Sequence, residues 1–298
     1  MNILITGASG LIGSALQQAL KQDGHQLFIM QRPLKPDADF SWQPDKNMIH
    51  WDKTKPIDAV IHLAGANIAN GRWTAARKKL IIDSREQSTL LLANTLAQLA
   101  QPPKLFISGS AIGFYGDTGA QSVDEDSPLG SGFLAEICKR WEAATQAATD
   151  AGIRTIHMRT SIVLSPKGGA LRQMLTPFKL GLGGRVGSGQ QYMSWVSLPE
   201  IINMIRFLLS NEQLSGPVNL VSKTAVNNAE FSRILGKVLH RPTVLPLPAF
   251  MVRLIFGEMG DALLLSSSRV YPKKLEQAGY IFMDTDLKQA LNRVLNST

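Results

Sequence analysis

A glycine-rich segment comes directly after the first apolar run of the chain, and it constrains the possible folds more than any other feature. Residues 2–6 resemble a short strand, and Gly7, Gly10 and Gly13 follow at intervals of three before a helical pattern begins. The first glycine permits a tight turn, the second lets the backbone approach a pyrophosphate, and the third allows close helix packing. The helix N-terminus presents free N–H groups and a partial positive charge to the phosphates. The residues expected at the phosphates are Gly7, Gly10, Leu11, Ile12 and Gly13.

Strand-like and helix-like patterns alternate after this loop. Apolar runs predict strands at residues 2–6, 26–30, 58–65, 104–108 and 153–164, with a short edge strand at 48–51. Helical stretches at 72–100 and 134–151 lie between them, and residues 33–47 are expected to be loop. Parallel neighbouring strands need crossover helices. The alternation therefore predicts an α/β fold with a Rossmann-type doubly wound parallel sheet.

The alternation weakens in the second half of the chain. Glycine and proline recur through residues 165–190, and helices are expected at 198–210 and 228–239. We place a domain boundary near residue 165. Residues 1–165 would form an NADP-binding Rossmann domain, and 166–298 a smaller mixed α/β substrate domain, with room for late segments to return to the sheet.

The end of the second strand predicts which nicotinamide cofactor is preferred. An acidic side chain there would accept hydrogen bonds from the ribose hydroxyls of NAD. This chain has Gln31 and Arg32 instead, and its next carboxylate is Asp37. A guanidinium can pair with the 2′-phosphate of NADP, so we expect NADP(H) to be preferred. The alternative is that Arg32 is an ordinary solvated loop arginine.

Charge is distributed unevenly along the chain. The formal net charge is +8, and residues 1–150 contribute −1 while residues 151–298 contribute +9. No acidic residue lies between Asp150 and Glu200. Such a one-sided field attracts anions, so an anionic small-molecule substrate is expected at Lys167, Arg172 and Arg185. Trp195 is a candidate for stacking on a base or sugar, with a buried core tryptophan as its alternative.

Several other classes of protein are disfavoured. The single cysteine allows no internal disulfide, and no Cys/His cluster has metal-ligand spacing. No apolar run approaches the roughly 18 residues that span a bilayer, so we expect no membrane partner and a cytoplasmic location. The basic residues are dispersed and lack interleaved aromatics, which disfavours nucleic-acid binding. Nucleic-acid binding through residues 154–185 would predict salt-sensitive retention on DNA.

Further segments carry a family resemblance. They include His62-Leu63-Ala64-Gly65, Ser108-Gly109-Ser110 before Phe114-Tyr115-Gly116, Val163–Leu171, Gly216-Pro217-Val218-Asn219 and Gly257-Glu258-Met259-Gly260. The chain resembles the extended short-chain dehydrogenase/reductases, and within them the NAD-dependent epimerase/dehydratase-like proteins of the YfcH-like, nucleoside-diphosphate-sugar epimerase subgroup. Its last segment resembles that subgroup's small C-terminal domain of unknown function. The likeness spans essentially the whole chain.

The resemblance implies where the cofactor lies. It should run along Leu63 and Ala64, with the main chain near Val163 passing the nicotinamide end. Arg85 occupies the position where many extended members have a helical asparagine, so it could reach the cofactor phosphates or ribose. A surface salt bridge is the alternative for Arg85. A homodimer through paired helices is the family expectation.

The usual catalytic pair of these enzymes is missing. A tyrosine normally passes the proton, and a lysine four residues later lowers its pKa and holds the ribose. Alignment of the helix on Trp141-Glu142 puts Leu134 and Cys138 at these positions, and no neighbouring register supplies both residues. Ser110 remains a candidate for orienting the substrate. Tyr115 is a candidate acid/base, with a structural role as its alternative.

Two functional hypotheses follow. The first is an NADP(H)-dependent oxidoreductase or epimerase, with the isomerase chemistry of that family, acting on an anionic, nucleotide-sugar-like small molecule. The second is a catalytically impaired, NADPH-binding regulatory protein, which the missing pair favours. Whether the chain turns over a substrate stays open at this stage. Cys138 is expected to be a small buried side chain, and His62 to be structural.

Overall fold

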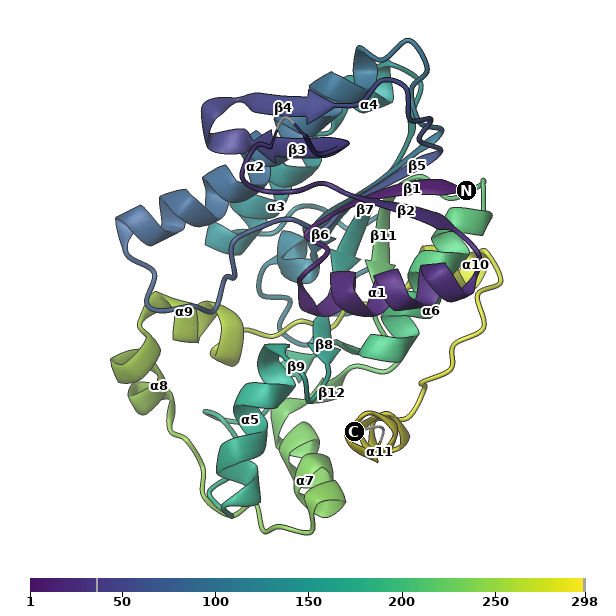
Figure 1. The fold of residues 1–298 in the computed structure, drawn as a ribbon. Coiled ribbons are helices and arrows are strands. Elements are labelled where there is room, and N and C mark those ends of the chain that lie inside the picture. The colour runs from purple at the N-terminus through teal and green to yellow at the C-terminus, as the bar shows by residue number, and fades with distance from the viewer. Residues whose placement is uncertain (36, 297–298) are drawn as a thin grey trace.

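A parallel sheet of six strands forms the centre of the fold (Figure 1). The structure is a computed structural model, and it describes residues 1–35 and 37–296. The strand order is β11-β7-β6-β5-β1-β2, and every pairing in it is parallel. The strands are β1 (Asn2–Thr6), β2 (Gln26–Ile29), β5 (Ala59–His62), β6 (Leu105–Ala111), β7 (Arg154–Thr160) and β11 (Gly216–Leu220). This arrangement confirms the predicted Rossmann-type fold class.

The order in which strands are added to the sheet reverses next to β1. The chain passes from β1 to β2 on one side and then crosses to β5 on the other side. In open α/β sheets, ligands bind in the crevice outside the carboxyl ends of the strands at such a switch point. The glycine loop between β1 and α1 (Leu11–Gln22) lies at this crevice.

Alternating side chains of the strands supply two cores, one on each face of the sheet. Ile3 and Ile5 of β1 point into one core, and Leu4 between them points into the other. This is the period of two that a strand buried on both faces requires. Helices α1 and α6 (Leu198–Ser210) cover the first face, and α2 (Ala75–Ala97) and α4 (Gln146–Asp150) cover the second.

A short hairpin corrects the loop assignment of residues 33–47. Strand β3 (Phe40–Gln43) pairs antiparallel with β4 (Met48–Trp51) around the short helix η1 (Pro44–Lys46). Gln31 forms a parallel bridge with Ser41, so the hairpin continues the sheet beyond the end of β2. The prolines of this segment had favoured a loop over a strand in the sequence analysis. Phe40 and Trp42 are buried, which supplies the apolar contacts that stabilise it.

The second half of the chain only partly leaves the sheet. The expected strand at 153–164 is two strands, because β8 (Ile162–Leu164) leaves the sheet and pairs with β10 (Trp195–Ser197). Beyond residue 165, β11 returns to pair with β7, and α6 packs on α1. The expected helices at 198–210 and 228–239 are α6 and α7 (Asn228–Leu239). The domain boundary near residue 165 stays a prediction.

A third core holds together the part of the chain below the sheet in Figure 1. It is built from α5 (Gly169–Lys179), α7, α11 (Leu287–Asn296) and β10. The remaining elements are α3 (Phe133–Ala143), α8 (Ala249–Phe256), α9 (Glu258–Gly260), α10 (Lys273–Gln277), β9 (Tyr192–Met193), β12 (Val226–Asn227), η2 (Ile112–Tyr115) and η3 (Asp261–Leu265). In the described residues, no helix has the length and apolar content that crossing a bilayer needs.

Candidate functional site

The glycine loop is packed so closely that side chains would not fit at two of its positions. Gly7 has a φ of +67°, and a Cβ there would lie 2.6 Å from the carbonyl carbon of Leu63. A Cβ at Gly13 would lie 2.4 Å from the carbonyl oxygen of Gly7. The loop therefore rests directly on the chain that leaves β5, and the first turn of α1 rests on the loop.

The first turn of α1 is free to bind an anion. Gly10 is its N-cap residue, and no side chain caps the helix. The first N–H groups of a helix have no partner within it, and a helix N-terminus favours negative charge. Gly10 is exposed and places no side chain over these groups. A cofactor pyrophosphate therefore fits against this turn, beside the backbone N–H groups of Leu11, Ile12 and Gly13.

The end of β2 carries the arginine that the sequence analysis assigned to cofactor selection. Gln31 and Arg32 are both exposed. The Arg32 guanidinium donates to the carboxylate of Asp45, with 3.2 Å between Nη2 and Oδ1. This partner was not predicted, because Asp45 lies in the turn of the hairpin that was expected to be loop. Both side chains are more than half exposed, so the pair is weak and can open to a phosphate.

A chain of buried hydrogen bonds holds the backbone at Leu63 and Ala64, which we call the shelf, beside the glycine loop. The backbone N–H of Ala64 donates to Thr6 Oγ1 at 3.2 Å, and that oxygen lies 2.6 Å from His62 Nδ1. The other ring nitrogen of His62 lies 3.0 Å from Thr89 Oγ1. Burial, with a smaller effect from the charge of Arg85, lowers the pKa of His62 to about 3. His62 is therefore a neutral, hydrogen-bonded core residue, as expected.

The buried imidazole predicts a loss of stability in mild acid. Below about pH 6.5 the unfolded chain binds a proton at His62, while the folded chain stays neutral until about pH 3. The folded-state pKa is the lower one, so this stability is present at neutral pH and is lost as the pH falls. We expect His62→Gln to remove about 2 kcal/mol of the difference in unfolding free energy between pH 7 and 5.

Urea unfolding at both pH values measures this effect, and His240→Asn at an exposed histidine is the control. The comparison uses the pH dependence of each variant rather than its absolute stability. An unchanged pH dependence in His62→Gln would contradict the assignment.

Arg85 lies beside the same shelf. Its Nη1 donates to the carbonyl of Ile81 at 3.1 Å, and its Cζ lies 4.9 Å from the centre of the Trp141 ring. A Cβ on Gly65 would lie 3.4 Å from that Cζ. Burial lowers the pKa of Arg85 to about 10, so it remains a cation at neutral pH. Among the described residues it has no carboxylate in ion-pair range, so the salt bridge considered as its alternative is not present.

A buried ion pair holds Ser110. The Ser110 hydroxyl donates to Glu142 Oε1 at 2.7 Å. Both oxygens of Glu142 accept from the guanidinium of Arg159, each at 2.8 Å. Burial opposes the charged form of Arg159, but its hydrogen bonds and charge pairing with Glu142 outweigh that cost and raise its pKa. Ser110 and Arg159 face each other across β6 and β7, which is why their side chains meet.

Buried polar groups surround the Tyr115 hydroxyl. Its hydroxyl donates to Asn219 Oδ1 at 2.8 Å and accepts from Arg159 Nη1 at 2.9 Å. The side chain is buried, and this burial, despite the nearby charge of Arg159, raises the pKa of Tyr115 to about 12. Tyr115 is thus a structural member of the network around Arg159.

The positions aligned with the missing catalytic pair contain apolar groups. A Cβ on Gly113 would lie 3.0 Å from Leu134 Cβ and 3.8 Å from Cys138 Sγ, so both side chains pack against η2. Burial, reinforced by the charge of Glu142, raises the pKa of Cys138 to about 12. Its thiol donates to the carbonyl of Ala111 at 3.4 Å. Cys138 is therefore a neutral buried thiol, as expected.

The four expected substrate residues lie in three different places. Lys167 and Arg172 are exposed at the start of α5, where Arg172 Nη1 donates to the Lys167 carbonyl at 3.2 Å. This segment touches the cofactor loop, because a Cβ on Gly168 would lie 3.3 Å from the Leu11 side chain. Arg185 instead lines a shallow hollow beside α7, and no residue of the glycine loop or the shelf lines that hollow.

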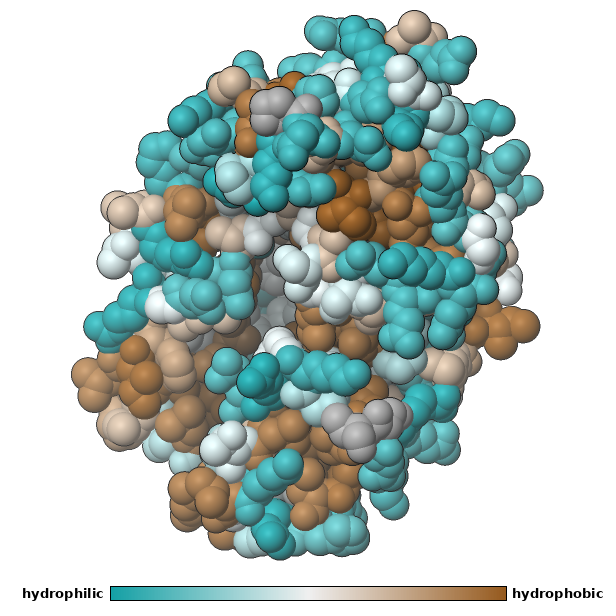
Figure 2. Space-filling model, viewed as in Figure 1, coloured by the Kyte–Doolittle hydropathy of each residue, from teal (hydrophilic) through white to brown (hydrophobic). Residues whose placement is uncertain are grey.

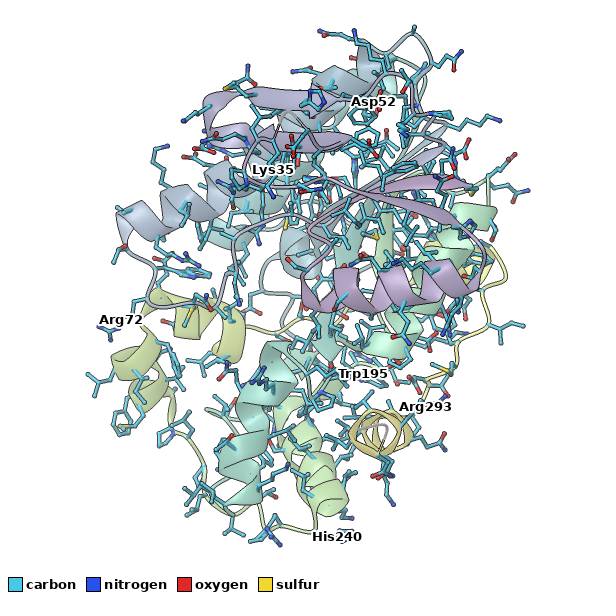
Figure 3. The ribbon with its side chains drawn as sticks, in the orientation of Figure 1. Lys35, Asp52, Arg72, Trp195, His240 and Arg293 are labelled. Atoms are coloured by element: carbon cyan, nitrogen blue, oxygen red, sulfur yellow. The ribbon has the colours of Figure 1, made fainter. Side chains whose placement is uncertain are left out.

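Trp195 presents no ring face at the surface on which a ligand could stack. It is fully buried in the third core, among residues that include Leu164 and Phe231 (Figure 3). The alternative considered for it, a core tryptophan, is correct. Val163, which is half-buried in β8, has its carbonyl oxygen 3.5 Å from where a Cβ on Gly169 would lie. The main chain at Val163 thus faces the start of α5.

Comparisons with known proteins agree with this geometry. The family model described as the NAD dependent epimerase/dehydratase family matches residues 3–220. The chain belongs to the NAD dependent epimerase/dehydratase family. A domain of unknown function, DUF1731, matches residues 247–294. The epimerase family protein Mb2239 of Mycobacterium bovis is 42% identical over 290 residues, which are 97% of this chain and 96% of that protein.

Two solved structures of epimerase family members are similar over the whole chain. The human epimerase family protein SDR39U1 (isoform 2), crystallised with NADPH, is 32% identical with a TM-score of 0.90, and the match covers 100% of both chains. A nucleoside-diphosphate sugar epimerase from Corynebacterium glutamicum is 32% identical with a TM-score of 0.81. This chain covers 58% of that longer chain and is itself covered completely.

Most of the polar network behind Ser110 was not predicted from the sequence. Glu142 was used only to align the helix, and Arg159 was counted only among the basic residues of the second half. The sequence signal was an acidic residue in an otherwise apolar helix face that contains Ile137, Cys138 and Trp141. An arginine within a predicted strand was the second signal. In the described residues, no group of His, Cys, Asp and Glu side chains has a metal-binding arrangement.

Proposed function

We propose that this epimerase family member binds NADP(H) and acts as an oxidoreductase or epimerase on an anionic, nucleotide-linked small molecule. The single observation that carries this proposal is the uncapped first turn of α1 behind a loop in which Gly7 and Gly13 leave no room for a side chain. The likeness to human SDR39U1, which was crystallised with NADPH, supports the choice of cofactor.

Different residues around the crevice would contact different parts of the cofactor. We infer that Gly10, Leu11 and Ile12 would hold the pyrophosphate, Arg32 and Gln31 the adenosine ribose, and the shelf at Leu63 and Ala64 the middle of the molecule. Arg85, which has no carboxylate in ion-pair range among the described residues, would face the other ribose, and the main chain at Val163 would face the nicotinamide. When bound, the cofactor supplies or accepts a hydride.

Ser110 would orient the reacting group of the substrate. Its hydrogen is committed to Glu142, so its oxygen presents lone pairs that accept a hydrogen bond from a substrate hydroxyl. The rigid Arg159–Glu142 pair fixes that direction. Lys167 and Arg172 at the start of α5 supply positive charge for an anionic substrate. The Tyr115 phenol is engaged by Asn219 and Arg159. We therefore expect slow turnover, because general acid–base catalysis typically contributes about 10²–10⁴-fold.

Arg32→Ala tests the cofactor assignment. We expect its NADPH dissociation constant to rise about ten- to a hundredfold, because a charge-assisted contact of roughly 1.5–3 kcal/mol is lost. The NADH dissociation constant should stay unchanged. Asp45→Ala is the matched control, because it frees Arg32 from its partner and should not weaken NADPH binding. Similar dissociation constants for NADPH and NADH, unaffected by Arg32→Ala, would contradict the proposal.

The second candidate function is an NADPH-binding regulatory protein without turnover. The observation that favours it is the apolar packing of Leu134 and Cys138 where the catalytic pair would lie. NADPH oxidation across a panel of carbonyl compounds, including nucleotide-linked keto sugars, separates the two. Turnover that falls in Ser110→Ala supports the enzyme. Tight NADPH binding without turnover on any of them supports the regulator.

A further inference from the structure

Exposed apolar side chains gather along one edge of the molecule. Seven of the thirteen large apolar side chains that are exposed in the described residues lie between residues 180 and 255, and 48–76% of each is exposed. Figure 2 shows brown atoms along the lower left of the molecule, over α8 and the lower end of α5. We call this set the apolar edge. Its members are Leu180, Leu182, Val244, Leu245, Phe250, Leu254 and Ile255.

Two segments far apart in sequence form this edge together. Arg241 Nε donates to the carbonyl of Lys179 at 2.8 Å, and the Leu247 N–H donates to the carbonyl of Arg185 at 2.9 Å. A Cβ on Gly184 would overlap the carbonyl of Leu245. The loop after α5 and the loop before α8 therefore lie side by side, joined by these hydrogen bonds. Their apolar side chains are exposed.

Cations line the side of the apolar edge that faces α7. A shallow hollow of about 550 Å³ beside it is lined by residues that include Arg233, Lys237, His240 and Arg241, and no carboxylate lines it. His240 is at the lower end of α7 in Figure 3. Arg185 and Arg233 line a second hollow, again without a carboxylate. In the part of the chain that the structure describes, Lys179, Lys237 and Arg241 have no carboxylate in ion-pair range, and Arg233 has only Glu230, at 4.0 Å.

We propose that the apolar edge and its cations form a docking surface for an anionic lipid membrane. Exposed aliphatic side chains beside lysine and arginine match a bilayer surface, where acyl chains accept the apolar groups and anionic headgroups attract the cations. A second copy of the chain fits poorly, because two such surfaces would repel each other. The expectation of no membrane partner rested on the absence of a spanning segment, and a surface-bound protein needs none. The excess positive charge of residues 151–298 acts in the same direction.

Co-sedimentation with vesicles tests the proposal on the full chain. We expect binding to vesicles of phosphatidylcholine with about 40% phosphatidylglycerol, and binding at least about tenfold weaker to pure phosphatidylcholine. Raising the salt concentration should weaken the binding, because exposed charges are screened. In the absence of vesicles, the solution mass should be the same for the unmodified chain and for the variants of the apolar edge described below.

Two variants separate the apolar and the electrostatic parts. We expect Leu182→Ser/Val244→Ser/Leu254→Ser and Lys179→Gln/Arg233→Gln/Lys237→Gln each to weaken vesicle binding about tenfold or more. The controls remove three exposed apolar groups elsewhere (Leu90→Ser/Leu129→Ser/Ile281→Ser) or three exposed lysines elsewhere (Lys53→Gln/Lys139→Gln/Lys288→Gln). All these sites are exposed, and circular dichroism verifies that each variant is folded.

Three results would overturn the proposal. The first is no binding to anionic vesicles, or equal binding to neutral ones. The second is a loss of binding in the control variants as large as that in the edge variants. The third is a doubling of the solution mass that the edge variants abolish, which would make the edge a contact between copies of the chain.

Discussion

Glu142→Ala is expected to lower the free energy of unfolding by about 3–5 kcal/mol, because it leaves the buried guanidinium of Arg159 without its partner. Only 4% of the Arg159 side chain and 11% of that of Glu142 are exposed. The substitution also removes the acceptor that holds the Ser110 hydroxyl. Urea unfolding followed by circular dichroism measures the loss, and the midpoint should shift without a change in the slope.

The same helix offers the control. Glu136 pairs with Arg140 one turn away, but both side chains are nearly half exposed. Exposed pairs of this kind contribute about 0–1 kcal/mol, so Glu136→Ala should be nearly neutral. If Glu142→Ala costs no more than Glu136→Ala, the ion pair behind Ser110 does not stabilise the fold. Glu142→Gln should lie between the two, because it keeps an acceptor for Ser110.

Gly13→Ala is expected to abolish measurable NADPH binding and also to destabilise the chain by about 1–3 kcal/mol, because a Cβ 2.4 Å from the Gly7 carbonyl oxygen forces the loop to move. Gly10→Ala should separate these effects. Its Cβ would lie 3.2 Å from the same oxygen, which a small shift accommodates. It should therefore keep near-normal stability while it weakens NADPH binding by about a hundredfold, because the pyrophosphate can no longer approach the backbone.

Isothermal titration with NADPH and urea unfolding, carried out on the same samples, give both quantities. Ser14→Ala, at an exposed position in the next turn of α1, is the control and should change neither. Full NADPH affinity in Gly10→Ala would show that the phosphates do not approach this part of the loop. Full stability in Gly13→Ala would show that the loop is less rigid than its packing indicates.

Much of the fold was predictable because its signals are local. The strands β1, β2, β5 and β6 are short apolar runs, and the helices between them show helical periodicity. The hairpin β3–β4 was not predictable in the same way. Prolines surround it, and its stability comes from Phe40 and Trp42, which pack against distant residues such as Leu4 and Leu92. The end of β7 was also hidden, because residues 153–164 form one continuous pattern although β8 joins a different sheet.

The candidate site, too, was predictable only where its sequence signals are local. Residues of the glycine loop were assigned from their spacing, and the structure shows them at the crevice. Trp195 and Tyr115 each kept a chemical and a structural interpretation, because a sequence does not show whether an aromatic ring is buried. Their environments come from the third core and from Arg159, which lies 44 residues after Tyr115.

The sequence alone determined the doubly wound sheet and the glycine loop before α1, because strand–helix alternation and glycine spacing act through neighbouring residues. The tertiary structure alone decided which polar groups meet. Tyr115 and Asn219 are 104 residues apart, and Ser110 and Glu142 are 32 apart. Such pairs form only once the order of the strands is set, and burial then gives each pair its charge state. The order of β6, β7 and β11 therefore created the rigid ion pair behind Ser110, which no local pattern encodes.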